Sequence, residues 1–329
     1  MTDIGLGAIG STWPMSRLGP SRMSIRRAAP ATVSAIAMLA MVAVCAGLEP
    51  GVLSVDGLTL VLTSTVPLVI AAEAQMVMMA AGDLDLGIGA FVGLVTAIAA
   101  TTLATSPLTG VALLAALLVG YGLLGAFVHL RRVPSILATL GASFVWLGLG
   151  LTILAVPGGS TPAWLGQVAT WNPGFIPAPL VWIVAVSVLV YAVTQRSGLG
   201  MRLRALGSNA TALERAGLRP LATRVTVYVI VGVLGVLAGL MLAGQIGTGD
   251  PNAATDYTLT TVAAVIIGGG AFVGGNGVPF GVAIGAMTLG LIGVVLSLLG
   301  VASTWQPAVQ GLILFVVLAG RVVALKVLR

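Results

Sequence analysis

The sequence predicts an all-α membrane protein, a polytopic bundle of about ten transmembrane helices. Hydrophobic residues make up 58% of the 329 residues and charged residues only 7%, whereas a soluble domain carries about 25% charged residues. The apolar residues form long runs, most of them near the roughly 20 residues that a helix needs to cross the hydrocarbon core. Basic residues are confined to a few of the segments between these runs, as expected when those segments stay on the cytoplasmic side.

The counts of single residue types exclude several kinds of site. Cys45 is the only cysteine and His129 the only histidine, so we expect neither an intrachain disulfide nor a metal site. The only lysine is Lys326, and a phosphate-binding G-x-x-x-x-G-K-[ST] loop is absent. The net charge of +6 is scattered between apolar runs, which does not indicate nucleic-acid binding. We therefore expect a membrane protein without a cofactor or a catalytic centre of its own.

The first 30 residues differ from the rest of the chain. They combine four arginines with Gly, Ser and Pro, which predicts a disordered cytoplasmic tail, residues 1–30. The apolar run 31–48 is interpreted as the first span. The alternative is a signal-peptide core, because Arg26 and Arg27 resemble a twin-arginine signal. Residues 31–329 are predicted to form a single transmembrane domain.

Nine further spans follow the first in the hydropathy pattern. They are predicted at about 58–81, 86–103, 110–130, 134–156, 179–194, 221–244, 259–272, 278–298 and 305–325. With both termini inside, all 15 Lys and Arg residues fall in or beside the inner segments. The outer segments then carry four acids and no cation: Glu49, Asp56, Asp250 and Asp256. This asymmetry favours ten spans with both ends cytoplasmic.

The order of the spans also suggests an internal symmetry. A single span is followed by a block of four (58–156), a further single span (179–194) and a second block of four (221–325). The two blocks start from opposite sides of the membrane. That parity suits an inverted repeat of two four-helix blocks, a common device of transporters.

The most polar internal segment is 196–224, which holds six of the 15 basic residues. The sequence from Ser208 to Ala216 begins with capping residues and continues in helix formers, which predicts a short surface helix. A short helix on a cytoplasmic loop (196–220) suits docking of a partner. The alternative is an ordinary positive-inside loop.

Acidic residues at the edge of the membrane are candidates for a transport pathway or gate. Asp83 and Asp85 lie in a glycine-containing break between two spans, and Glu73 lies inside a span with Gln75 close by. Asp85 also suits the N-cap of the span that follows. Three further polar residues in or at the end of spans are pathway candidates, although Thr and Ser often only join helices: Thr139, Ser143 and Gln245.

Two irregular segments complete the pattern. The long outer loop 157–179 carries Trp164, Trp171 and Phe175, which suit either an interfacial aromatic belt or contact with a soluble partner. The glycine-dense break 268–279 has no lysine after it, so tight helix packing and a sharp reversal explain it better than phosphate binding.

Four stretches carry a resemblance to a known family. Residues 82–89 read G-D-L-D-L-G-I-G, similar to G-G-I-D-L-S-V-G, and residues 134–141 read P-S-I-L-A-T-L-G, similar to P-x-F-I-x-T-L-G. Residues 200–209 resemble G-R-x-x-x-A-I-G-G-N, and residues 262–269 with the G-G at 274–275 resemble I-A-A-V-V-x-G-G and its downstream G-G. In this order and spacing the motifs resemble the inner-membrane permeases of bacterial ABC importers that serve ribose and related sugars.

The chain departs from that family pattern at a few positions. Asp83 stands where Gly is usual, Gly87 where Ser is usual and Ile136 where Phe is usual, and residues 257–261 lack an acidic pair. These departures concern the solute more than the architecture. The related branched-chain amino-acid permeases carry an N-F-A-x-G-E pattern where this chain has D-L-D-L, so the resemblance favours sugars.

The resemblance implies a set of partners. They are a cytoplasmic ABC ATPase dimer that binds ATP-Mg, a second permease chain, an extracytoplasmic solute-binding protein and the lipid bilayer. Residues 208–217 would form the coupling helix in a cleft of the ATPase. The residues expected to couple to the ATPase are Arg202, Arg204, Gly207, Ser208, Asn209, Glu214 and Gly217, with both arginines facing ATPase acids.

A different class of transporter also fits the composition. An ion-coupled secondary transporter would use Glu73, Asp83 and Asp85 as its coupling acids. ATP-dependent transport with a separate ATPase supports the first hypothesis, and uptake driven by a proton or sodium gradient supports the second.

Overall fold

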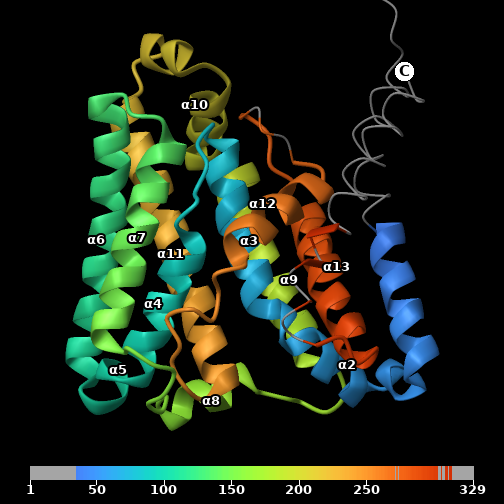
Figure 1. Cartoon of the computed structure of the whole chain (residues 1–329). Helices are drawn as coiled ribbons and strands as arrows, with labels where there is room; N and C mark the ends of the chain where they lie inside the picture. The colour runs from blue at the N-terminus through green and yellow to red at the C-terminus, as the bar shows by residue number, and fades with distance from the viewer. Residues whose placement is uncertain are drawn as a thin grey trace, which may run out of the picture.

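In the computed structural model, the described residues are 35–270, 272, 274–302, 305, 308–309 and 311–312. This part of the chain is helical and contains no strand (Figure 1). The predicted tail 1–30 and most of the predicted span 305–325 lie outside it. The elements are η1 (Pro50–Leu53), α2 (Val55–Thr63), α3 (Thr65–Ala80), α4 (Ile88–Ala100), α5 (Thr102–Thr105), α6 (Pro107–Arg131), α7 (Ser135–Ile153), α8 (Ala163–Ala169), α9 (Ala178–Tyr191), η2 (Ala192–Arg196), α10 (Gly198–Arg215), α11 (Pro220–Ile246), α12 (Tyr257–Ile267) and α13 (Pro279–Leu298).

Six helical segments of the described residues are long and apolar enough to cross a membrane, and α2 with α3 makes a seventh if this pair, bent by 50°, is one span. The predicted spans at 110–130 and 134–156 correspond to α6 and α7, and the one at 221–244 to α11. The predicted span 259–272 is wrong in length, because α12 has only 11 residues and ends before Gly268. The described helix Ala35–Leu48 is also shorter than a span.

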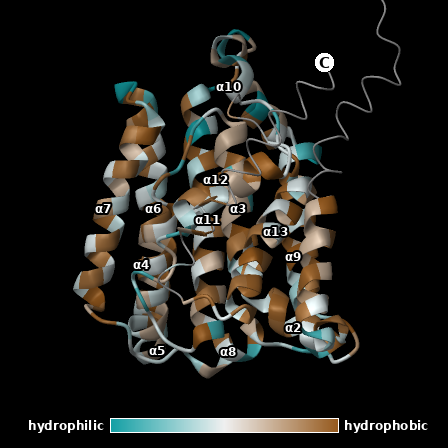
Figure 2. Cartoon of the chain, turned by 45° about the vertical axis from the view of Figure 1, so that its right-hand side comes forward, coloured by the Kyte–Doolittle hydropathy of each residue, from teal (hydrophilic) through white to brown (hydrophobic). Residues whose placement is uncertain are grey.

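Polar and apolar residues separate along the length of the bundle. Hydrophilic residues gather at its two ends, with α10 at one end and α5 and α8 at the other (Figure 2). The outer helices present large apolar side chains outward, such as Leu123 on α6 and Phe144 on α7, which are 66% and 69% exposed. In lipid such side chains need no protein cover, so the chain is a multi-pass membrane protein.

Helix α3 lies at the centre of the bundle. All 16 of its residues are buried, and α11, α12, α13 and α9 pack around it. Close approach elsewhere in the bundle depends on small residues. A Cβ added to Gly235 of α11 would lie 2.8 Å from the ring of Phe91, and one added to Gly125 of α6 would lie 2.8 Å from the ring of Tyr228.

Two non-helical connectors interrupt the bundle. The α3–α4 connector comprises residues 81–87 and the α11–α12 connector residues 247–256. Figure 1 shows the first running from the α10 end of α3 toward α4, and the second running from the opposite end toward α12. The two short helices that follow therefore begin inside the bundle rather than at its ends.

Glycines on one face of α4 make room for the α11–α12 connector. A Cβ on Gly93 would lie 2.0 Å from the carbonyl oxygen of Pro251, and one on Gly89 would lie 2.4 Å from that of Ala254. Thr96, on the same face, donates to the Asp250 carbonyl at 2.9 Å and accepts from the Asp250 N–H at 3.0 Å. These two hydrogen bonds satisfy the backbone N–H and carbonyl of Asp250, which lies in a connector without helical hydrogen bonds.

Candidate functional site

Helix α10 is divided at Asn209, whose backbone is extended (φ −162°, ψ 92°). Its first half begins at Ser197, which caps the N–H of Gly200 at 3.1 Å. Its second half begins at Asn209, whose side chain accepts from the N–H of Ala212 at 2.9 Å. The predicted short helix is confirmed, and of the two predicted capping residues, Ser208 and Asn209, it is Asn209 that caps it.

The second half of α10 ends in a left-handed glycine. Gly217 has φ +75°, its N–H donates to the carbonyl of Glu214 at 2.9 Å, and the N–H of Leu218 donates to that of Leu213 at 3.3 Å. This pair of bonds is a Schellman motif, which terminates the helix sharply. The role of Gly217 visible in the structure is therefore to end the short helix.

Some of the predicted coupling residues are exposed, whereas Arg204 and Gly207 contact other parts of the chain. The exposed members are Arg202, Ser208, Asn209, Glu214 and Gly217. Arg204 is half-buried, and its guanidinium donates to the carbonyl of Thr194 and, at 3.1 Å, to the side chain of Gln195. Arg204 thus holds α10 against η2. These contacts favour a structural role for Arg204 over its predicted pairing with an acid of the ATPase.

Gly207 is the point at which α10 meets the bundle backbone to backbone. A Cβ added there would lie 2.1 Å from the carbonyl oxygen of Ala80, 2.8 Å from the nitrogen of Gly275 and 2.9 Å from the carbonyl carbon of Ala81. The N–H of Gly275 itself donates to the Ala80 carbonyl at 2.8 Å. The last residue of α3, the connector after it and the glycine-dense segment before α13 therefore converge on one glycine of α10.

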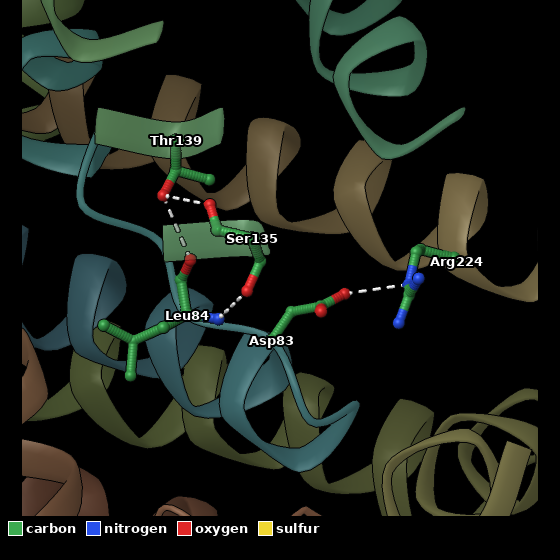
Figure 3. A network of polar contacts seen from close by, with 5 residues as sticks. All are labelled: Asp83, Leu84, Ser135, Thr139 and Arg224. Carbon is green, nitrogen blue, oxygen red and sulfur yellow. Dashed lines mark hydrogen bonds and ion pairs between the residues drawn. The ribbon is translucent and has the colours of Figure 1, made fainter. Parts of the chain in front are cut away.

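The α3–α4 connector is anchored on α7 and α11 (Figure 3). On α7, Ser135 Oγ accepts from the N–H of Leu84 at 3.1 Å, and Thr139 Oγ1 lies 3.1 Å from the Leu84 carbonyl and accepts from the N–H of Leu86 at 3.0 Å. Thr139, predicted as a pathway residue, thus supplies hydrogen bonds to a partly buried non-helical backbone.

Asp83 points from the connector toward α11. Its Oδ2 lies 3.0 Å from Nε of Arg224, with Asp83 5% and Arg224 21% exposed. Burial raises the pKa of the Asp83 carboxyl, and the Arg224 charge opposes that rise. The sequence places Arg224 in the basic segment but gives no signal that it pairs with an acid so far away along the chain.

Asp85 is not the N-cap of α4, which is Gly87. Its Oδ1 accepts from the N–H of Gly87 at 2.7 Å, and its Oδ2 accepts from the hydroxyl of Tyr121 at 2.8 Å. The Tyr121 ring lies edge-on to Phe91 with centroids 4.6 Å apart and stacks on Trp146 at 5.9 Å. Asp85 therefore joins the connector to an aromatic cluster between α4, α6 and α7.

Removing the Tyr121 hydroxyl tests how much this contact contributes. We expect Tyr121→Phe to lower the free energy of unfolding by about 1–3 kcal/mol, because Oδ2 of the buried Asp85 loses its donor. A second variant, Asp85→Asn, keeps the size of the side chain but removes its charge, and it is expected to reduce transport. Thermal unfolding in detergent measures the first effect and uptake the second. Full transport by Asp85→Asn would restrict Asp85 to a local structural role.

A cavity of about 620 Å³ lies between α10 and this connector. Side chains of both charge signs line it, namely Asp83, Arg132, Glu214 and Arg224, together with the imidazole of His129. The exposed half of α10 thus borders the same hollow as the Asp83–Arg224 ion pair. A shift of α10 relative to the bundle would change the shape of this cavity.

The remaining predicted pathway residues lie apart from this cavity. Glu73 and Gln75 of α3 are fully buried; Oε1 of Glu73 accepts from Ser187 of α9 at 3.0 Å, whereas Oε2 and both polar atoms of Gln75 have no partner among the described residues. Ser143 donates to the Leu140 carbonyl of its own helix at 2.6 Å, and its role in a pathway stays a prediction. Gln245 lines a different cavity, at the end opposite α10.

Comparison with known proteins places the chain in a family. The family model described as branched-chain amino acid transport system / permease component matches residues 57–318. The ribose import permease protein RbsC of Escherichia coli K12 is 30% identical over 292 residues, covering 85% of this chain and 90% of that protein. The autoinducer 2 import system permease protein LsrC of Enterobacter sp. 638 is 31% identical over 299 residues, covering 86% and 84%.

A third relative is the probable ABC transporter permease protein YphD of Escherichia coli K12, 31% identical over 275 residues, which cover 81% of this chain and 82% of that protein. No solved structure matches the chain. The family match covers most of the sequence, including the four resembling stretches and the whole of α10. The chain therefore belongs to the family of permease components of branched-chain amino acid transport systems, whose members here include ABC transporter permeases.

Proposed function

We propose that this chain is the permease subunit of an ATP-binding-cassette importer that moves a sugar or sugar-like solute into the cytoplasm. The relatives that cover most of the chain are import permeases for ribose and for autoinducer 2. Energy would come from a separate cytoplasmic ATPase dimer that holds ATP-Mg. A second permease chain and an extracytoplasmic solute-binding protein would complete the assembly.

The contact of Gly207 is the observation that carries the mechanism. The exposed half of α10 would sit in a cleft of the ATPase, and the Gly207 contact would pass its movement to the end of α3 and to Gly275. Because backbone meets backbone there without an intervening flexible side chain, α10 and α3 move together. Helix α3 carries Glu73, so movement of the ATPase would reach the buried centre of the bundle.

The proposed architecture is ten spans in two inverted blocks with both termini cytoplasmic, and the arrangement of the connectors supports its inverted relation. In each proposed block a long helix is followed by a non-helical connector and a short helix: α3, 81–87 and α4 in the first, and α11, 247–256 and α12 in the second. The two connectors enter the bundle from opposite ends (Figure 1). Opposite entry of equivalent segments is what an inverted repeat requires.

Reconstitution in liposomes tests the proposed function. The chain with its ATPase and the loaded solute-binding protein is expected to take up solute only when ATP is present on the ATPase side. The chain alone is expected to show no ATP hydrolysis and no uptake. Uptake by the chain alone along a proton or sodium gradient would instead support the ion-coupled transporter.

Reversing the charge at Glu214 tests the exposed surface of α10. We expect Glu214→Arg to leave membrane insertion and basal ATP hydrolysis intact but to lower uptake about tenfold. The ATPase surface that receives the Glu214 carboxylate would repel an arginine at this position. Glu214→Gln is the matched control and should lose less. Equal uptake by Glu214→Arg and the unaltered chain would argue against docking at this residue.

A further inference from the structure

Helix α8 and the residues just after it present large apolar side chains away from the bundle, at the end opposite α10 (Figure 2). Trp164, Val168 and Trp171 are 52%, 41% and 47% exposed, and their spacing of four and three residues places them on one face. The opposite face packs on α11 through Leu165 and Ala169, which are buried. The three exposed side chains together are called the α8 stripe.

The backbone that carries the α8 stripe is fastened to the rest of the protein on both sides. A Cβ added to Gly244 of α11 would lie 2.7 Å from the carbonyl oxygen of Leu165, so the two helices touch. In the loop before α8, Gly158 and Gly249 exchange two backbone hydrogen bonds, at 3.0 and 2.9 Å. The stripe is therefore held in place before any partner arrives, which lowers the conformational entropy that docking costs.

One end of the α8 stripe borders a polar hollow. Trp171 lines the cavity of about 630 Å³ at this end of the bundle, together with the carboxylate of Asp56 and the amide of Asn172. Hydrocarbon would leave such groups without hydrogen-bonding partners, so the hollow faces water. The stripe thus differs from the outer faces of α6 and α7, whose exposed apolar side chains have no polar hollow beside them in the described structure.

The exposed charges near this hollow are negative. Glu49, the N-cap of η1, and Asp56, in the first turn of α2, are both exposed acids at this end. The Lys and Arg residues of the described part of the chain are all arginines of the α10 end, within 131–132 and 196–224. An acidic rim repels the anionic headgroups of a phospholipid surface and attracts a basic protein surface.

From these observations we infer that the α8 stripe and the rim of the hollow dock a soluble protein whose own surface is apolar at its centre and basic around it. Trp164 and Trp171 supply the apolar contacts, since Trp is enriched among the residues that carry interface energy. Asp56 supplies a charge that orients the partner. In the proposed function this partner is the extracytoplasmic solute-binding protein, so its identity rests on that function.

Labelling of an engineered cysteine tests this surface. In a Cys45→Ala background, Gln167→Cys places a thiol on the exposed side of α8 and leaves both tryptophans intact, whereas Phe144→Cys places one on the outer face of α7. In the assembled complex in lipid nanodiscs without ATP, a membrane-impermeant maleimide is expected to label Gln167→Cys but not Phe144→Cys. The solute-binding protein that supports uptake is expected to slow the labelling of Gln167→Cys.

Two further substitutions in the Gln167→Cys background test the apolar and the charged contact separately. Trp164→Ala and Asp56→Lys are each expected to raise the concentration of solute-binding protein needed for half-protection about tenfold. Asp56→Asn is the matched control for charge reversal and should give a smaller rise, and Phe144→Ala should give none. Added salt should weaken protection less in Asp56→Lys than in the chain that retains Asp56.

Four outcomes would overturn the inference. No labelling of Gln167→Cys would place the stripe in lipid, and labelling only after the two permease chains separate would make it an interface between them. Labelling that the solute-binding protein does not slow, or equal half-protection in Asp56→Lys and the chain that retains Asp56, would remove the docking role. If uptake persists in any of these cases, the proposed function stands; protection without ATP-dependent uptake would overturn the proposed function alone.

Discussion

Replacing Gly207 by alanine is expected to lower ATP-driven uptake by about tenfold or more while the ATPase continues to hydrolyse ATP. A Cβ at this position would lie 2.1 Å from the Ala80 carbonyl oxygen and 2.8 Å from the Gly275 nitrogen, so α10 must move away from α3. Both neighbouring atoms belong to the backbone and have no rotamer to change. The larger Gly207→Trp should abolish the contact and uncouple hydrolysis from transport completely.

The same helix provides a matched control for that substitution. Gly198 is also in α10, but a Cβ added there meets nothing within 4 Å. Gly198→Ala should therefore transport solute as well as the unaltered chain or be slightly more stable. Uptake and ATP hydrolysis measured in parallel on both variants separate lost coupling from lost folding. Normal uptake by Gly207→Ala would contradict the proposed transmission through this contact.

The second large effect is expected at the ion pair of Asp83 and Arg224. Arg224→Gln leaves the Asp83 carboxylate, only 5% exposed, without its cation, and should lower the free energy of unfolding by about 3 kcal/mol. Asp83→Asn should cost less, because Arg224 is 21% exposed and borders the open cavity beside α10. Thermal unfolding of the purified chain in detergent measures both.

A double substitution checks the cause of that loss. Asp83→Asn combined with Arg224→Gln removes both charges, so no buried charge is left uncompensated. The double variant should recover much of the stability lost by Arg224→Gln alone, and the difference between them is the coupling energy of the pair. Additive losses in the double variant would show that the two side chains act independently.

The long spans could be predicted closely from the sequence because their signal is local. Apolar runs bounded by charge place α6, α7 and α11 within a few residues of their observed bounds. Asn209 and Gly217 similarly mark the ends of the short helix of α10 by their own chemistry. These features depend on neighbours in the chain, which a single sequence contains.

The connectors could not be predicted in the same way. Gly89 and Gly93 read as ordinary small residues of a span, and only the structure shows that the chain near Pro251 passes over them. The predicted span 259–272 ends five residues too late, because α12 stops at Ile267, before Gly268. A non-helical segment that packs on glycines has no periodicity by which to recognise it.

The candidate site was predicted in part. Asp83, Asp85 and Thr139 do gather at one connector, but as groups bonded to Arg224, Tyr121 and the backbone of Leu84. Arg224 lies on α11, Tyr121 on α6 and Leu84 in the connector, each many residues away from the side chain that it contacts. A sequence without homologues gives no pairing signal for such contacts. Asp85 was placed as an N-cap because it precedes α4, whereas the extended connector shifts that role to Gly87.

The central claim is that a separate ATPase binds the exposed half of α10. Site-specific cross-linking tests this claim most directly. In a Cys45→Ala background, Thr211→Cys places a thiol on this half of α10, and Thr170→Cys places one at the opposite end of the bundle. With a short thiol-to-amine cross-linker in the assembled complex, Thr211→Cys is predicted to cross-link to the ATPase subunit and Thr170→Cys is not. Cross-linking of the ATPase from Thr170→Cys, with none from Thr211→Cys, would contradict the account.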